Sequence, residues 1–269
     1  MPTPDGPRLL VLKIGGSLFS DKRRDRHLDG AAVRHYARVA AALHRTAPGR
    51  VVLVSGGGSY GHGAVRDLDP ADPFAALPLT GVNAELRWVW TEALREAGVP
   101  AFPVQFAATA VLGADGTPAL CGEAVPRLLA TGILPVLSGD CLPGHGGRLV
   151  VVGSDLVPGA LIALAPRATR IVMLTDVDGV MDGPAVVPRL TPATAGSALG
   201  VLREAPRWDT TGSMVGKLKA LLGHAGDGAE CVILNGARAE AAAPFLLEPL
   251  SRWPEALPRT TVVADGVPA

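Results

Sequence analysis

Lysine is rare in this chain, and its placement points to chemistry. Only four of the 25 basic residues are Lys. Lys13 and Lys22 flank a glycine-rich turn in "KIGGSLFSDK", and Lys217 and Lys219 lie together in "TTGSMVGKLKA". An ammonium group is a compact point charge that fits against a phosphate where the planar guanidinium of Arg would not. The Lys residues therefore predict a site for a phosphate-bearing ligand.

Two glycine-rich turns strengthen this prediction. Gly15, Gly16 and Ser17 follow an apolar run, and a second run ends in "SGGGSYGHG", which contains Gly57 and Gly58. Because Gly has no Cβ, backbone N–H groups in such turns can approach an anion closely. Neither turn has the spacing of a Walker motif or of a dinucleotide fingerprint. Two such turns at successive strand ends nevertheless favour a phosphate cradle over ordinary tight turns.

Two titratable residues are candidates for the same site. His62 has Gly on both sides, which predicts a ring exposed on a loop and favours ligand contact. The remaining histidines have no comparable setting, and we interpret them as surface or packing residues: His27, His35, His44, His145 and His224. Asp155 in "VGSDLVPGA" precedes a predicted helix, so both a helix cap and a functional carboxylate remain open.

Two later segments carry further polar groups. Asp176 and Asp178 follow an apolar run in "LTDVDGVM", where a simple Asp-Gly turn is the alternative interpretation. In "WDTTGSMVGKLKA", hydroxyl groups such as that of Thr211 precede a helix that carries Lys217 one turn later. Hydroxyls, backbone N–H groups and a helix N-terminus all favour phosphate oxygens.

The elements that must position these residues alternate along the chain. Apolar runs such as "RLLVLKIGG", "RVVLVSGGG", "ILPVLSGD" and "RIVMLTDVDG" are separated by helical patterns. Unbroken apolar strands are typical of a sheet covered on both faces, so we predict an α/β fold with a mainly parallel sheet. Ligands in such folds bind at the carboxyl ends of the strands, where the glycine clusters stand. The segment "GDCLPGHGGRLVVVGSD" predicts a β-hairpin around residues 143–147.

Length and charge limit the remaining possibilities. We expect residues 1–269 to form a single domain, with two lobes that meet near residue 165. The formal charge is zero and no basic patch is interleaved with aromatic residues, so we expect no nucleic-acid partner. No run of about 18 or more apolar residues occurs, so we expect no membrane. The three Cys are scattered, which favours reduced packing residues and a cytoplasmic protein.

The motifs in this order resemble the amino acid kinase family: Lys-x-Gly-Gly-Ser, the triple-glycine loop, "GSD", "TDVDG" and "TGSMVGK". The resemblance covers nearly the whole chain and implies a three-layer α/β sandwich. Within the family, "KIGGSLFSDK" and "GGGSYGHG" resemble the branch of isopentenyl phosphate kinase and fosfomycin-resistance kinase. The stretches "GHGAVRD" and "WDTTG" are closer to the fosfomycin kinase, whereas "VGK" and "SY" are at least as close to isopentenyl phosphate kinase.

The resemblance implies an ATP- and Mg²⁺-dependent kinase that phosphorylates a small anionic phosphonate or phosphate, with fosfomycin as the first choice of acceptor. The alternative acceptor is isopentenyl phosphate, and a further alternative is a non-catalytic nucleotide-binding regulator or storage protein. A homodimer is expected, with an acceptor-binding lobe over residues 1–165 and a nucleotide-binding lobe over residues 166–269.

The same resemblance implies roles for individual residues. The catalytic residues would be Lys13, Lys217, Asp155 and His62, with Asp155 holding the two Lys in place. The acceptor would be bound by Lys22, Gly57, Gly58, His62, Ser154 and Thr211. ATP would be bound by Lys13, Gly15, Gly16, Ser17, Thr175, Asp176, Asp178, Gly179, Gly212 and Lys217. Mg²⁺ would be held largely by the oxygens of ATP rather than by protein ligands.

The size of the acceptor should also be reflected in the shape of the pocket. A small phosphonate requires a compact site, which Trp88 or Trp90 could narrow beyond His62. An isopentenyl tail requires an apolar channel, for which residues 81–94 and 106–112 are the candidates. We expect the compact site.

Overall fold

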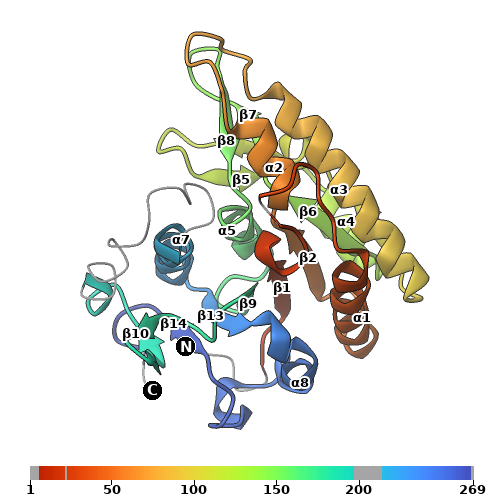
Figure 1. Ribbon diagram of the computed structural model, residues 1–269. Coiled ribbons are helices and arrows are strands. Elements are labelled where there is room, and N and C mark those ends of the chain that lie inside the picture. Colours follow the sequence, from red (N-terminus) through yellow and green to blue (C-terminus); the bar gives the residue numbers. More distant parts are fainter. Residues whose placement is uncertain (1–5, 22, 197–213, 268–269) are drawn as a thin grey trace.

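The computed structural model describes residues 6–21, 23–196 and 214–267, and its centre is a mainly parallel sheet (Figure 1). Within these residues the strands follow the order β12-β14-β13-β9-β1-β2-β6-β3. Their bounds are β1 (Leu9–Ile14), β2 (Val51–Ser55), β3 (Ala101–Pro103), β6 (Leu134–Ser138), β9 (Thr169–Thr175), β12 (Arg189–Leu190), β13 (Glu230–Asn235) and β14 (Thr260–Val262). Neighbouring strands run parallel except β13 and β14, which confirms the predicted sheet.

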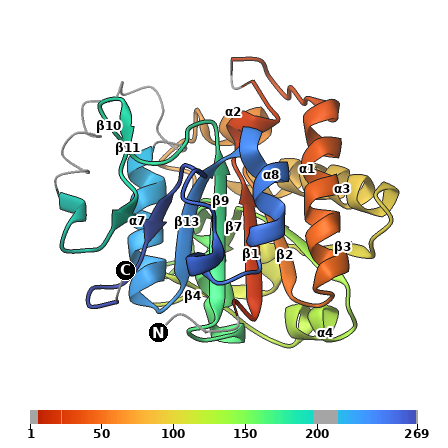
Figure 2. The same cartoon turned by 90° about the horizontal axis from the view of Figure 1, so that it is seen from below.

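Helices cover both faces of this sheet, as the unbroken apolar strands require. Leu10 and Leu12 of β1 belong to the core beneath α1 (Gly30–Thr46), α3 (Leu77–Glu96) and α8 (Ala239–Ala242). Leu9 and Val11 belong to the core beneath α4 (Ala124–Ala130), α5 (Val157–Leu161) and α7 (Met214–Gly226). Figure 2 shows α1 and α8 together on one side of the sheet. The predicted three-layer α/β sandwich is therefore confirmed.

Three short antiparallel pairs extend from this framework: β4 (Ala110–Leu112) with β5 (Pro118–Leu120), β7 (Asp140–Pro143) with β8 (Leu149–Val152), and β10 (Met181–Asp182) with β11 (Ala185–Val186). The β7–β8 pair confirms the predicted hairpin around residues 143–147. It stands beside the connection between α2 (Gly58–Val65) and α3 (Figure 1), where the N–H of Leu149 donates to the carbonyl of Pro73 at 2.9 Å. The hairpin thereby brings β8 close to α2.

Other expectations about the whole chain have mixed outcomes. Cys141 and Cys231 are buried as predicted, whereas Cys121 is exposed and is not a packing residue. Across the described ranges, no helix is both long and apolar enough to cross a membrane. The division into lobes near residue 165 lies between α5 and β9 within one continuous sheet, and it stays a prediction.

The order of the strands places a crevice at the carboxyl end of β1. The chain continues from β1 to β2 on one side, whereas from its other neighbour, β9, it continues to strands on the opposite side. Ligands in open α/β sheets bind at such a reversal of strand order. The turns after β1 and β2 are packed backbone to backbone there. A Cβ placed on Gly16 would lie 2.6 Å from the nitrogen of Gly58 and 2.7 Å from its Cα. Only Gly at position 16 permits this approach without moving the chain.

We therefore expect Gly16→Ala to destabilise the fold by about 2 kcal/mol, because overpacking against backbone atoms cannot be relieved by a side-chain rotation. The matched control is Gly81→Ala in the interior of α3, where a Cβ meets nothing within 4 Å. This control should stabilise the protein by roughly 0.5–1 kcal/mol. Urea unfolding measures both changes. A Gly16→Ala variant as stable as the parent would contradict the close approach.

Candidate active site

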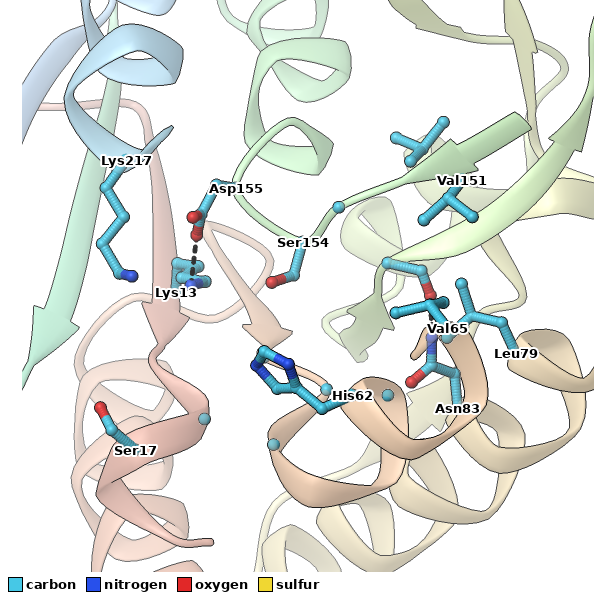
Figure 3. A pocket seen from close by; sticks show the side chains of 18 of the residues that line it. Lys13, Ser17, His62, Val65, Leu79, Asn83, Val151, Ser154, Asp155 and Lys217 are labelled. Atoms are coloured by element: carbon cyan, nitrogen blue, oxygen red, sulfur yellow. Dashed lines mark hydrogen bonds and ion pairs between the residues drawn. The ribbon is translucent and has the colours of Figure 1, made fainter. Parts of the chain in front are cut away.

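A pocket of about 300 Å³ opens in this crevice (Figure 3). It brings together many of the residues singled out from the sequence: Lys13, Gly16, Ser17, Gly57, Gly58, His62, Ser154, Asp155, Asp176 and Lys217. They come from β1, α2, α7, the turns after β1, β2 and β9, and the turn between β8 and α5. Both glycine turns and two of the four Lys, Lys13 and Lys217, thus meet at the strand ends as predicted.

A buried ion pair lies at the centre of the pocket. Lys13 near the end of β1 is 3% exposed, and its ammonium group pairs with the carboxylate of Asp155 (Figure 3). Burial alone would raise the pKa of Asp155, but the charges of Lys13 and Lys217 outweigh it and leave this pKa below its usual range. The carboxylate is therefore ionised at neutral pH.

The same geometry resolves the two interpretations left open for Asp155. The residue that caps α5 is Leu156, and it makes no side-chain capping bond. The interpretation of Asp155 as a helix cap is therefore wrong, and its carboxylate serves the pocket.

Lys217 reaches the pocket from the opposite side. It is largely buried on α7, and its side chain points toward Lys13 and Asp155 (Figure 3). Two turns later on the same helix, His224 is also buried, and burial lowers its pKa, so the ring is neutral at pH 7. Its Nε2 donates to the backbone carbonyl of Asp155 at 2.9 Å. From the sequence, His224 is expected to be a surface or packing residue, although its seven-residue spacing from Lys217 places both on one helix face.

His62 lies on a helix rather than on the predicted loop. Gly is a poor helix former, but tertiary contacts fix α2. The N–H of Ser59 donates to the hydroxyl of Ser20 at 2.7 Å, and Ser59 itself is buried. The ring of His62 points from this helix toward Ser154 and the ion pair (Figure 3).

The far end of the pocket is apolar, as the alternative acceptor requires, but its side chains lie outside the segments expected to build an apolar channel. Val65 of α2, Leu79 of α3 and Val151 of β8 line it (Figure 3). In that view His62 lies between these side chains and Lys217. The pocket thus has a charged end and an apolar end. The apolar run at the end of the hairpin is a sequence signal for this apolar wall. Only the fold, however, directs the side chain of Val151 toward Val65 and Leu79.

The Trp residues and the segment 106–112, which were expected to shape this end of the pocket, do not line it. Trp90 is completely buried and packs edge-on against Phe19, with ring centroids 5.2 Å apart, and Trp88 is 53% exposed. Neither lines the pocket, and the segment 106–112 does not line it either. Trp90 shares a helix face with Asn83, which does line the pocket, but lies about 10 Å farther along α3, while Trp88 faces away. The expectation that Trp88 or Trp90 narrows the site is therefore wrong.

Several predicted nucleotide-site residues lie beside the pocket rather than in its wall. They are Gly15, Thr175, Asp178 and Gly179. The hydroxyl of Thr175 donates to Asp176 at 3.0 Å. Asp178 accepts from Arg238 at 3.0 Å and from Asn235 at 2.9 Å, and the bond from Arg238 is the main reason that its pKa is lowered. Lys22, Thr211 and Gly212 lie outside the described residues.

The chain is similar to known proteins over most of its length. The model of the amino acid kinase family matches residues 8–235. The chain is 34% identical over 223 residues to the isopentenyl phosphate kinase of Haloferax volcanii, which covers 80% of this chain and 87% of that protein. It is 28% identical over 247 residues to the isopentenyl phosphate kinase of Methanothermobacter thermautotrophicus, covering 85% of this chain and 91% of that protein.

A solved structure agrees on the fold. The crystal structure of an isopentenyl phosphate kinase in a substrate complex matches with a TM-score of 0.71 at 19% identity, over 94% of this chain and 100% of that one. The family match extends over most of the chain and includes the end of β1, both glycine turns and α7. This chain therefore belongs to the amino acid kinase family.

Proposed function

We propose that this kinase transfers the γ-phosphoryl group of ATP to the phosphate of isopentenyl phosphate. The observation that carries the proposal is the division of the pocket into a charged end at Lys13 and Lys217 and an apolar end at Val65, Leu79 and Val151 (Figure 3). An acceptor with an anionic head and a short apolar tail matches both ends. The two relatives named isopentenyl phosphate kinase support the same acceptor.

The charges of the pocket suit this transfer. The attacking oxygen of a phosphate is already anionic, so it needs no general base, but two polyanions must approach each other. Lys13 and Lys217 converge on one region from different elements and would offset that repulsion. Asp155 would hold Lys13 in position through their ion pair. We therefore assign these three residues to the phosphoryl transfer.

The remaining roles divide along the pocket. His62 and Ser154 lie between its two ends and would bind the acceptor phosphate, together with Gly57, Gly58, Lys22 and Thr211. The nucleotide phosphates would lie along the turns after β1 and β2, where Gly16 and Gly58 line the pocket and backbone N–H groups can approach an anion. The other nucleotide-site residues would be Gly15, Ser17, Thr175, Asp176, Asp178, Gly179 and Gly212.

The described wall of the pocket contains two carboxylates, Asp155 and Asp176, and the first is already paired with Lys13. Mg²⁺ would therefore be held largely by phosphate oxygens. When bound, it would neutralise part of the negative charge of the nucleotide phosphates. The proposal also includes a cytoplasmic location, a homodimer and a division into two lobes. Fosfomycin, the first choice from the sequence, becomes the second candidate, because the apolar end favours a longer tail. A nucleotide-binding regulator without turnover is the third candidate.

The acceptor is tested by comparing isopentenyl phosphate, methyl phosphate and fosfomycin in an ATP-coupled assay. Four additional carbons buried at about 0.8 kcal/mol each should give isopentenyl phosphate a kcat/KM roughly 100-fold above that of methyl phosphate. Efficient turnover of fosfomycin with none of isopentenyl phosphate would reject the proposal in favour of the second candidate. Absence of turnover with any acceptor would favour the regulator.

Charge stabilisation is tested by removing each ammonium group. Lys13→Met and Lys217→Met should each lower kcat by about 100-fold or more, because each loses a cation that acts on the transferring group. Lys219→Met is the matched control, since Lys219 lies on the same helix but is exposed. Its kcat should equal that of the parent. Near-parental turnover in the first two variants would show that the phosphoryl group is transferred elsewhere.

The role of Asp155 is tested by its pH dependence. Because its pKa is lowered, the carboxylate stays ionised at neutral pH, and its stabilising contribution is lost only as the pH falls through that lowered value. Asp155→Asn should therefore reduce kcat by a similar factor at pH 6, 7 and 8. If Asp155 were instead a general base, the variant would lose an acidic limb that the parent profile shows.

A further inference from the structure

One face of α3 carries polar side chains to which the proposed reaction assigns no role, although one of them, Asn83, lines the pocket. Thr80, Asn83 and Arg87 have spacings of three and four residues, so they lie in a row along the helix. We call this row the α3 stripe. Asn83 and Arg87 are each 2% exposed. Burying an amide and a guanidinium is unfavourable unless both find partners, so their contacts require an explanation.

The α3 stripe bonds to three consecutive residues in reverse order, and Thr80 Oγ1 also lies 3.1 Å from the Sγ atom of the next residue, Cys141. Arg87 Nη1 donates to the hydroxyl of Ser138 at 2.8 Å. Asn83 Nδ2 donates to the carbonyl of Gly139 at 2.7 Å, and Thr80 Oγ1 donates to the carboxylate of Asp140 at 2.6 Å. A charge contact joins the two ends of this network, because Arg87 lies 3.8 Å from the completely buried Asp140. Each residue of the stripe is therefore hydrogen-bonded to one residue of the segment 138–140.

Residues 138–140 form the corner where β6 passes into β7, and the corner supports the pocket wall. A Cβ on Gly139 would lie 2.7 Å from the carbonyl oxygen of Val152 and 2.9 Å from the nitrogen of Ser154. The corner is therefore in tight backbone contact with the turn that carries Ser154. Any shift of the corner would move this turn, because close-packed backbone cannot absorb it.

The α3 stripe also contacts the opposite wall. α2, the helix that carries His62, packs along α3. The Oδ1 atom of Asn83 is directed at the start of this helix, because a Cβ built on its N-cap Gly57 would lie 3.7 Å from that atom and one built on Gly61 would lie 3.8 Å from it. Asn83 thus lies beside the helix of His62 and is hydrogen-bonded to the corner behind Ser154.

We infer that the α3 stripe is a positioning device that sets the spacing between α2, with His62, and the turn with Ser154 and Asp155. Its residues act through the corner and through α2, not on the phosphoryl group. Because His62 and Ser154 are the proposed acceptor contacts, loosening the stripe should impair alignment of the acceptor more than binding of ATP. The kinetic consequence rests on the proposed function, whereas the mechanical linkage does not.

Two threonines of α3 provide a matched test. Thr80→Val removes the bond to Asp140 with little change in shape. Thr91→Val removes a buried hydroxyl whose bond, at 2.8 Å, goes to the carbonyl of Arg87 in the same helix. Thr80→Val and Asn83→Leu should raise the acceptor KM about five- to tenfold and leave the KM for ATP within about twofold, as expected for one lost hydrogen bond. Thr91→Val should leave both KM values unchanged, and Thr80→Ser should restore the parental acceptor KM.

Amide hydrogen exchange of the ligand-free protein tests the linkage without any acceptor. Thr80→Val and Asn83→Leu should exchange faster across residues 139–155, whereas Thr91→Val and Thr80→Ser should match the parent. Equal effects of Thr80→Val and Thr91→Val would indicate a general loss of helix stability and overturn the inference. Unchanged exchange and unchanged acceptor KM in both stripe variants would also overturn it. If the parent phosphorylated no acceptor, the proposed function would fail, and the exchange pattern would still decide the linkage.

Discussion

The ion pair between Lys13 and Asp155 is the interaction on which the arrangement of the pocket depends. An ammonium group buried near the end of the central strand is strongly unfavourable without a partner, and breaking such a pair typically costs about 3–5 kcal/mol. The partner comes from the turn after β8, far along the chain. The β7–β8 hairpin must therefore return to the carboxyl end of β1 to place Asp155 beside Lys13. The requirement of one buried charge therefore links the central strand, the hairpin and the start of α5.

A second constraint acts on the backbone. Gly16 and Gly58 pack so closely that neither turn can shift without the other. Their contact fixes the start of α2 relative to β1, and with it the direction from which His62 enters the pocket. Charge and backbone packing thus hold the two sides of the site independently. The ion pair joins β1 to α5, and the glycine contact joins β1 to α2.

The two ends of the pocket are built from different elements. The charged end comes from β1, α7 and the turn before α5, and the proposed phosphoryl transfer would account for its Lys and Gly. The apolar end comes from α2, α3 and β8, and in the proposed function side chains such as Leu79 and Val151 would follow the shape of the acceptor. The α3 stripe lies behind this second end. Its buried polar bonds hold the corner behind Ser154, and they are sensitive to geometry because an unpaired group would be costly.

The sequence by itself determined the fold class and most of the charged end of the site. Apolar runs, glycine turns and isolated Lys are local signals, and parallel strands bring their carboxyl ends to one edge. Only the tertiary structure decided that Asp155 pairs with Lys13 instead of capping α5, that His62 lies on a helix, and that Trp90 belongs to the core. It also decided that Leu79 and Val151 face the same pocket and that Asn83 contacts Gly139. These outcomes depend on which way each side chain points, and one residue along a helix turns that direction by about 100°. Contacts between distant segments therefore follow from packing and cannot be obtained from spacing alone.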